Sequence, residues 1–155
     1  MARTRSERSG RARSLSRRLA LQALYQWQMT GQSLAELRNQ YAQDEGYAEV
    51  DQEYFLALLA GVVEGAAQLD GMLGDWIDRP VAQLDPVEHA VLWIGIDELR
   101  AHLEVPYRVV LNESVELAKK FGATEGHKFI NAVLDRAARQ LRAEEQAATS
   151  KRSPG

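Results

Sequence analysis

The stretch VPYRVVLNESVELAKKFGATEGHKFINAVLDRAARQL, residues 105–141, determines how the rest of the chain is expected to fold. Apolar residues recur through it with the period of a helix, which predicts two helices separated by Gly122. Pro106 suits a helix start, because its missing N–H would be unpaired there anyway. Gly122 is expected to adopt a left-handed C-cap and Thr124 to cap the next helix. The sequence therefore predicts a helical hairpin with a polar, mostly basic rim around its turn.

Capping residues mark further helices along the chain. Ser33 is followed three residues later by Glu36, which is the pattern of a capping box. Asp85 and Pro86 form a helix start, because aspartate caps well and proline suits the first helical position. The predicted helices before the hairpin are 14–30, 33–41, 51–77 and 86–102, with a short turn at 81–84. Since no segment alternates convincingly as a strand, the sequence predicts an all-α fold of six to seven helices.

Length and composition indicate an ordinary soluble globular protein. The chain has 155 residues, of which 45% are hydrophobic and 26% charged. The expected organisation is an arginine-rich arm that is disordered when free (1–13), one helical domain (14–142) and a flexible tail (143–155). No apolar run is long enough to span a bilayer, and no secretory signal is recognisable. These observations favour a cytoplasmic protein that is not associated with a membrane.

Charge is unevenly distributed along the chain. Residues 1–18 contain seven arginines and one glutamate, so they carry +6, and the net charge of −3 leaves −9 for the remainder. A basic arm on an acidic body indicates a polyanionic partner for the arm. A solvated tail without a partner is the alternative.

The first predicted helix combines basic and aromatic side chains. Ser14 or Ser16 is expected to cap it, and Gly31 to end it. Arg13, together with arginines on the helix itself, would neutralise phosphates, and an aromatic ring would stack on an unpaired base. Core packing is the alternative for that ring. The outer side of the helix is expected to carry Arg17, Arg18, Gln22 and Tyr25.

The turn of the predicted hairpin has a similar character. Phe121 and Phe129 flank the glycine turn, and Lys128 adds positive charge. Because both phenylalanines also fall on the apolar stripes of their helices, core packing is the alternative for them.

Nothing in the sequence forms a catalytic or metal-binding constellation. His89, His102 and His127 are scattered, and none has a second ligand at helical spacing. The chain has no cysteine, which excludes disulfides and thiolate zinc sites, and no glycine-rich phosphate loop. We therefore expect a protein that is not an enzyme and needs no cofactor or metal.

Several segments resemble the NusB family of bacterial transcription antitermination factors. ELAKKFG (116–122) followed by HKFINAVLD (127–135) is similar to the family's C-terminal signature. The resemblance extends over roughly residues 13–141, in the right order. Further matching segments are RRLALQALYQWQM (17–29), LAGVVEGAAQLDGML (59–73) and DPVEHAVLWIGIDEL (85–99).

This resemblance implies an all-α fold of two packed three-helix subdomains and a non-enzymatic, RNA-binding function. Family members bind single-stranded boxA leader RNA of ribosomal RNA operons together with the ribosomal protein NusE. They thereby act indirectly with RNA polymerase and other Nus factors. The resemblance implies that Glu88 faces NusE. With Arg18 added from the charge pattern, the expected RNA contacts are Arg13, Arg17, Arg18, Tyr25, Phe121, Glu125, Lys128 and Phe129.

The chain departs from the family pattern at three places. Ser14, Leu15 and Ser16 interrupt the arginine run that usually stands just before the first helix. Glu125-Gly126 replaces an aspartate and a small polar residue, and Ala82 and Gln83 replace glutamates. Two other functional classes stay open beside RNA binding: a helical protein-interaction scaffold, and a fragment of an RNA-modifying enzyme. The second would need a cofactor-binding glycine motif that the chain lacks. A homodimer is also open.

Overall fold

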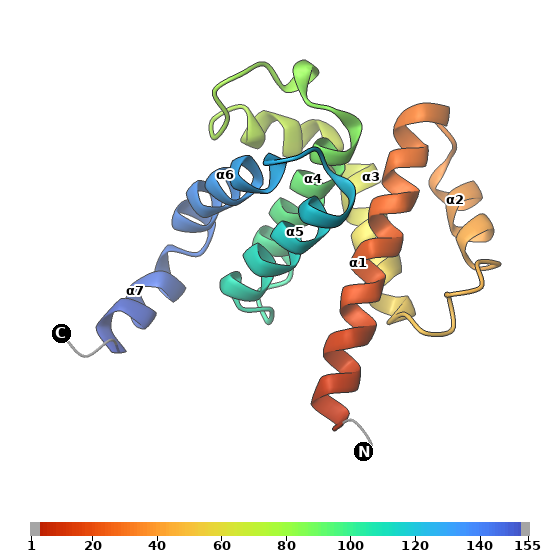
Figure 1. The fold of residues 1–155 in the computed structure, drawn as a ribbon, viewed down its shortest axis with the longest axis horizontal. Helices are drawn as coiled ribbons and strands as arrows, with labels where there is room; N and C mark the ends of the chain where they lie inside the picture. The colour runs from red at the N-terminus through yellow and green to blue at the C-terminus, as the bar shows by residue number, and fades with distance from the viewer. Residues whose placement is uncertain (1–3, 153–155) are drawn as a thin grey trace. The chain divides into compact units, whose positions relative to one another are not determined.

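The computed structural model describes residues 4–152, and the side chains of residues 4–148 (Figure 1). These residues form seven α-helices and a short 3₁₀ turn without any strand, which confirms the predicted all-α fold. The elements are α1 (Arg5–Thr30), α2 (Leu34–Tyr41), α3 (Gln52–Leu73), η1 (Val81–Gln83), α4 (Pro86–Ala101), α5 (Tyr107–Phe121), α6 (Gly126–Leu141) and α7 (Ala143–Arg152).

The chain divides into two compact units, Met1–Ala66 and Ala67–Gly155. The first unit contains α1, α2 and most of α3. The second contains the end of α3 and the helices that follow it. Each predicted group of functional residues therefore belongs to one unit or the other, and the two groups are described separately.

Helix α1 begins at Arg5, whereas the sequence predicts a start at Ser14 or Ser16. The Thr4 hydroxyl caps the helix by accepting the Glu7 N–H at 3.1 Å. The two serine hydroxyls instead donate to helix carbonyls one turn back, each at 3.0 Å. Residues 5–13, predicted to be disordered when free, are thus helical. Gly31 ends the helix with a φ of 67°, as predicted.

The other predicted caps are present. Ser33 accepts the Glu36 N–H at 3.1 Å, and Asp85 accepts the Glu88 N–H at 2.9 Å. Helix α3 ends at Leu73 rather than near residue 77. The chain leaves the helix there because Trp76 is buried, with its indole N–H donating to Gln140 at 3.2 Å. This tertiary contact overrides the apolar period, which continues past the end of the helix.

Helix α4 is the central helix of the second unit, as its apolar sequence predicts. It contacts both α5 and α6, which also contact each other, and every residue from 90 to 99 is buried (Figure 1). Gly95 permits this close packing. A Cβ at that position would lie 2.8 Å from the Leu134 side chain in α6 and 3.1 Å from the Ser114 hydroxyl in α5.

Helix α3 is long and apolar enough to cross a membrane by length and composition alone, with a mean hydropathy of 1.4. The prediction that no apolar run is long enough to span a bilayer is therefore wrong by this criterion. A core helix of a folded domain satisfies the same criteria, and α3 contributes fully buried side chains to the structure. These include Phe55, Leu58, Leu59 and Val62.

Candidate nucleic-acid interface

In the first unit, the N-terminal half of α1 contacts the start of α3 through cation–π contacts, an ion pair and a hydrogen bond. The guanidinium groups of Arg13 and Arg17 lie 4.4 and 5.5 Å from the centre of the Tyr54 ring. Arg13 Nε is also 3.6 Å from Asp51 Oδ2, and the Ser16 hydroxyl donates to the Asp51 carbonyl at 2.7 Å. Two of the three arginines predicted to contact phosphates are therefore engaged within the protein.

Arg17 is buried, with 2% of its surface exposed, and the prediction that it lies on the outer side of α1 is wrong. The reason is that Tyr54 offers its ring to the guanidinium, while the long side chain packs along apolar surface. Arg13 is half-buried, with a third of its side chain exposed. Because only 2% of its surface is exposed, Arg17 could contact RNA only if its guanidinium moved out of this buried position.

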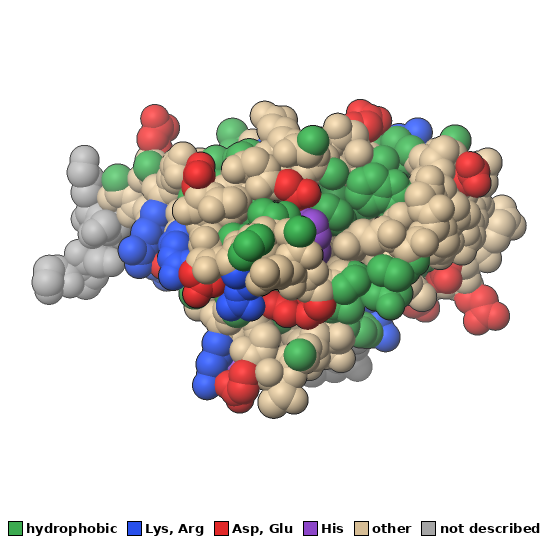
Figure 2. Space-filling model, turned by 90° about the horizontal axis from the view of Figure 1, so that it is seen from above, with side chains coloured by type: hydrophobic (Ala, Val, Ile, Leu, Met, Phe, Trp, Pro, Cys, Tyr) green, Lys and Arg blue, Asp and Glu red, His purple; other side chains and the backbone are tan. Residues whose placement is uncertain are grey.

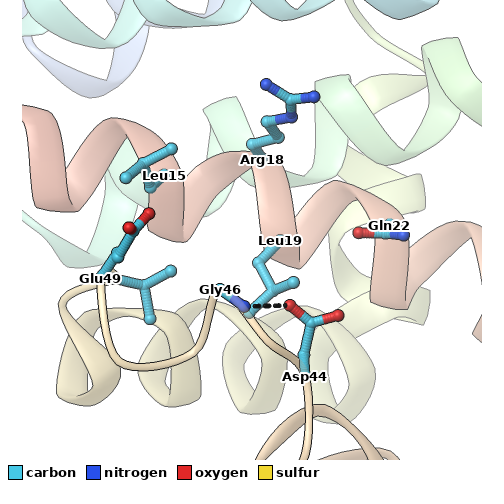
Figure 3. Close-up of a pocket in the computed structure, with 8 residues that line it drawn as sticks. Leu15, Arg18, Leu19, Gln22, Asp44, Gly46 and Glu49 are labelled. Carbon is cyan, nitrogen blue, oxygen red and sulfur yellow. Dashed lines mark hydrogen bonds between the residues drawn. The ribbon is translucent and has the colours of Figure 1, made fainter.

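Arg18 and Tyr25 do lie on the exposed side of α1, and Tyr25 is 44% exposed. Arg18 stands at the rim of a pocket of about 150 Å³ between α1 and the loop before α3 (Figure 3). Its guanidinium points away from Asp44 and Glu49 on the opposite side of the pocket. The carboxylates on the loop side of the pocket repel anions, whereas Arg18 on the α1 side attracts them. The pocket is lined by Leu15, Arg18, Leu19, Gln22, Asp44, Gly46, Glu49 and Val50.

In the second unit, the turn between α5 and α6 differs from the prediction. Gly122 is extended, with φ −89° and ψ 178°, and the left-handed residue is Glu125, with φ 69°. Glycine is needed at 122 because a Cβ there would lie 2.7 Å from the Ala118 carbonyl oxygen. Thr124 does not cap α6; Glu125 occupies the cap position without a side-chain hydrogen bond to the helix. The predicted left-handed Gly122 and the predicted Thr124 cap are both wrong.

The side chains of this turn present an aromatic ring and an ion pair. Phe121 is 40% exposed. Lys128 Nζ lies 2.6 Å from Glu125 Oε2, and both side chains are mostly exposed. Basic and acidic side chains also lie beside one another on the face shown in Figure 2. Phe129 is half-buried, and the Arg79 guanidinium lies 4.1 Å from the centre of its ring. Arg79 is not among the predicted site residues, because nothing local to that position indicates its aromatic partner.

Glu88 and Asp85 form a carboxyl pair at the start of α4. The hydrogen bond to Asp85, followed by burial and charge repulsion, raises the pKa of Glu88 to about 7, although nearby Arg79 opposes the shift. Burial would raise the pKa of Asp85, but hydrogen bonds from Glu88 and from the Val87 backbone outweigh it and lower that pKa. Glu88 is thus a partly protonated group near neutral pH, a property that the sequence does not reveal.

Two of the three histidines, His89 and His102, contact acidic side chains nearby. His89 Nε2 lies 2.6 Å from Asp70 Oδ1, and its ring stacks on Trp93 at a centroid distance of 3.9 Å. His102 Nε2 lies 3.7 Å from Asp97 Oδ2, and this nearby carboxylate raises the pKa of the imidazole although burial opposes it. Within the described residues, no group of three or more His, Cys, Asp or Glu side chains could hold a metal ion.

The chain is an all-α protein with arginine, tyrosine and phenylalanine side chains exposed on α1 and α5. The NusB family profile matches residues 14–139, and the chain belongs to this family. It is 50% identical over 141 residues to the transcription antitermination protein NusB of Hahella chejuensis (strain KCTC 2396), covering 90% of this chain and 95% of the relative. The protein of the same name from Marinomonas sp. (strain MWYL1) is 52% identical over 138 residues, covering 88% and 79%.

Solved structures share the fold. The chain superposes on T. maritima NusB with a TM-score of 0.71 and 23% identity, over 81% of this chain and 89% of the other. It matches a chain in a crystal structure of the antitermination factors NusB and NusE in complex with double-stranded RNA, with a TM-score of 0.68 and 24% identity. That match covers 88% of this chain and 99% of the other. These likenesses establish the NusB-like fold.

Proposed function

We propose that this NusB-family protein binds boxA-type single-stranded leader RNA of ribosomal RNA operons together with the ribosomal protein NusE. The family match over residues 14–139 carries the proposal. In this role the protein is a regulatory factor without catalytic activity or cofactor. It acts in the bacterial cytoplasm and reaches RNA polymerase and other Nus factors through the assembled complex.

On the first unit, Arg18 and Tyr25 are the proposed direct contacts. Both are exposed on α1, where an arginine can neutralise a phosphate and a tyrosine ring can stack on an unpaired base. Arg13 contributes from its partly exposed position beside Asp51. Arg17 contributes chiefly by holding Tyr54, and contacts RNA only if it is released.

On the second unit, Phe121 is the proposed stacking residue of the turn, because 40% of its surface is exposed. Lys128 is the proposed phosphate contact, for which the RNA backbone would compete with Glu125. Phe129 contributes through its ring edge, since a guanidinium lies over its face. Glu88 is the proposed contact for NusE, at a place where its carboxyl group is only half-buried.

The test is a titration of fluorescently labelled boxA RNA, with a scrambled RNA of equal length, in the presence and absence of NusE. We expect boxA to bind more tightly than the scrambled RNA. We also expect NusE to strengthen RNA binding by the same factor by which RNA strengthens NusE binding, because coupling between two sites is reciprocal. Binding of NusE with no affinity for either RNA would instead establish the protein-interaction scaffold.

A conservative pair of variants identifies the RNA-facing side of α1. Tyr25→Leu removes an aromatic ring that is 44% exposed, while Met29→Leu changes a side chain that is 54% exposed, one turn further along. Loss of a stacked base costs about 1–3 kcal/mol. We expect Tyr25→Leu to weaken boxA binding accordingly and Met29→Leu to leave it unchanged. Equal affinities of the two variants would remove Tyr25 from the proposed interface.

A further inference from the structure

Arg79 occupies an unusual position among the basic residues of the second unit. It lies in the connection between α3 and η1, and its guanidinium carbon is 4.1 Å from the centre of the Phe129 ring in the first turn of α6. A guanidinium over an aromatic face at this distance is a favourable cation–π arrangement. Pro80 follows Arg79 directly and restricts its backbone to extended conformations. The side chain is thus held at both ends, by its backbone and by the ring.

The stacked guanidinium keeps hydrogen-bonding capacity. Its Nε donates to Asp78 Oδ1 at 3.2 Å, and 43% of the Arg79 side chain is exposed. The Nη groups of Arg79 donate no hydrogen bond within residues 4–148. The Asp78 side chain is 80% exposed, and such a surface pair contributes little free energy. Glu88 is another acid near Arg79, and no hydrogen bond joins it to the Arg79 Nη groups, so the outer edge of the guanidinium is available to an anion.

The lysines near the same turn are placed differently. Lys128 is 2.6 Å from Glu125, and Lys119 is 3.7 Å from Glu116, and Arg79 likewise has Asp78 at 3.2 Å. The guanidinium of Arg79 differs because it is held over the Phe129 ring, and arginine guanidinium groups contact the phosphates and bases of single-stranded RNA. An arginine held by stacking also loses less side-chain freedom for each hydrogen bond that it forms.

We propose that Arg79, stacked on Phe129, is an RNA-contacting residue whose outer Nη groups bind a phosphate of single-stranded RNA. The inference rests on the proposed function, and it adds a contact from a segment outside α1 and the α5–α6 turn. A phosphate accepts two parallel N–H bonds from a guanidinium, which a lysine cannot provide. The contact fixes the position of the RNA backbone and does not itself read the base sequence.

The test compares three variants in RNA titrations over a range of salt concentrations. Arg79→Gln removes the charge, Arg79→Lys keeps the charge but loses the planar fork, and Arg139→Gln is the matched control. Arg139 is also exposed and near an acid, with Asp135 at 2.8 Å, and its replacement changes the net charge equally.

We expect Arg79→Gln to weaken boxA binding about tenfold at moderate salt, and to reduce the slope of log affinity against log salt by about 0.7. Arg79→Lys should keep the slope while losing several-fold in affinity, and Arg139→Gln should match the unmodified protein. As a measurement that needs no variant, the Nε–H resonance of Arg79 should shift when RNA is added.

Two results overturn the inference. If the unmodified protein binds boxA while Arg79→Gln behaves as Arg139→Gln does, the role of Arg79 is wrong and the proposed function stands. If the unmodified protein does not bind the RNA at all, both are wrong. An Arg79 resonance that stays in place on saturation with RNA would also overturn the inference, even if Arg79→Gln failed to fold.

Discussion

Arg142 donates a hydrogen bond of 2.5 Å to Glu145, and the other carboxylate oxygen of Glu145 accepts the backbone N–H of Tyr107 at 3.0 Å. The Arg142 side chain is almost fully buried. Together the two residues join the end of α4 to the start of α5, where both helices leave backbone groups without partners inside the helix. The carbonyls that accept from Arg142 are those of Glu98, Leu99 and His102, at 2.7–3.2 Å.

Removing Glu145 is expected to destabilise the second unit. In Glu145→Ala, the buried Arg142 guanidinium and the Tyr107 N–H both lose an acceptor, which costs about 1–3 kcal/mol. Glu144→Ala is the matched control, because Glu144 is the exposed neighbour in the same helix turn. Urea denaturation measures both. Equal midpoints for the two variants would show that the carboxylate of Glu145 does not hold this junction.

Gly122→Ala is expected to destabilise the α5–α6 turn. The new Cβ would lie 2.7 Å from the Ala118 carbonyl oxygen, a backbone atom that cannot turn away, so the turn must shift at a cost of about 1–3 kcal/mol. Gly126→Ala is the control within the same turn, because a Cβ there has no atom within 4 Å. In the first turn of α6, alanine should be neutral or stabilise by up to about 1 kcal/mol. Thermal unfolding measures the stability of both variants. An equal loss of stability in Gly126→Ala and Gly122→Ala would show that the close approach to the Ala118 carbonyl oxygen is not the cause.

Stability should depend on pH through Glu88. Its pKa is raised from the ordinary value of 4.5 to about 7, so the folded protein binds this proton more tightly than the unfolded chain does. The resulting stabilisation is fully present below pH 4.5 and is lost as the pH rises through about 7. Because the group is partly exposed, the effect after allowance for solvent screening is on the order of 1 kcal/mol.

The variant that tests this is Glu88→Gln, whose amide can donate to Asp85 at every pH. We expect the difference in unfolding free energy between the variant and the unmodified protein to shift in favour of the variant as the pH rises from 5 to 8. Urea denaturation at each pH measures this difference. Glu36→Gln is the control. Glu36 lies three residues after the cap of α2, as Glu88 does after the cap of α4, but the cap of α2 is Ser33 and carries no carboxyl group. A constant stability difference between Glu88→Gln and the unmodified protein across this range would contradict a raised pKa for Glu88.

The parts of the fold that depend on neighbouring residues were predictable from the sequence. The caps at Ser33 and Asp85 follow from side-chain oxygens that reach a backbone N–H three residues along. The apolar period likewise predicts α4 as a central helix. The start of α1 was not predicted, because the hydroxyls of Ser14 and Ser16 can either cap a helix or bond back within one.

The features that depend on contacts across the fold were not predictable. Nothing near Arg17 in the sequence indicates that Tyr54 will cover it. In the α5–α6 turn, sequence alone does not distinguish a glycine needed for a positive φ from one needed for a close approach, and Gly122 is of the second kind. The resemblance to the NusB family supplied candidate site residues but not their exposure. The structure shows that Arg18 is exposed whereas its neighbour Arg17 is buried.

Replacement of these two adjacent arginines by glutamine should affect different properties: the stability of the protein at position 17 and its RNA affinity at position 18. Arg17→Gln removes a buried guanidinium from the Tyr54 ring, so we expect a loss of about 1–3 kcal/mol in unfolding free energy. Arg18→Gln changes an exposed side chain, so stability should stay within about 0.5 kcal/mol. For boxA RNA, Arg18→Gln should weaken binding and lower the salt slope by about 0.7. Since both variants lose one positive charge from the same helix, a general effect of net charge would alter their RNA affinities equally. That result, in two folded variants of equal stability, would contradict both the burial of Arg17 and the contact proposed for Arg18.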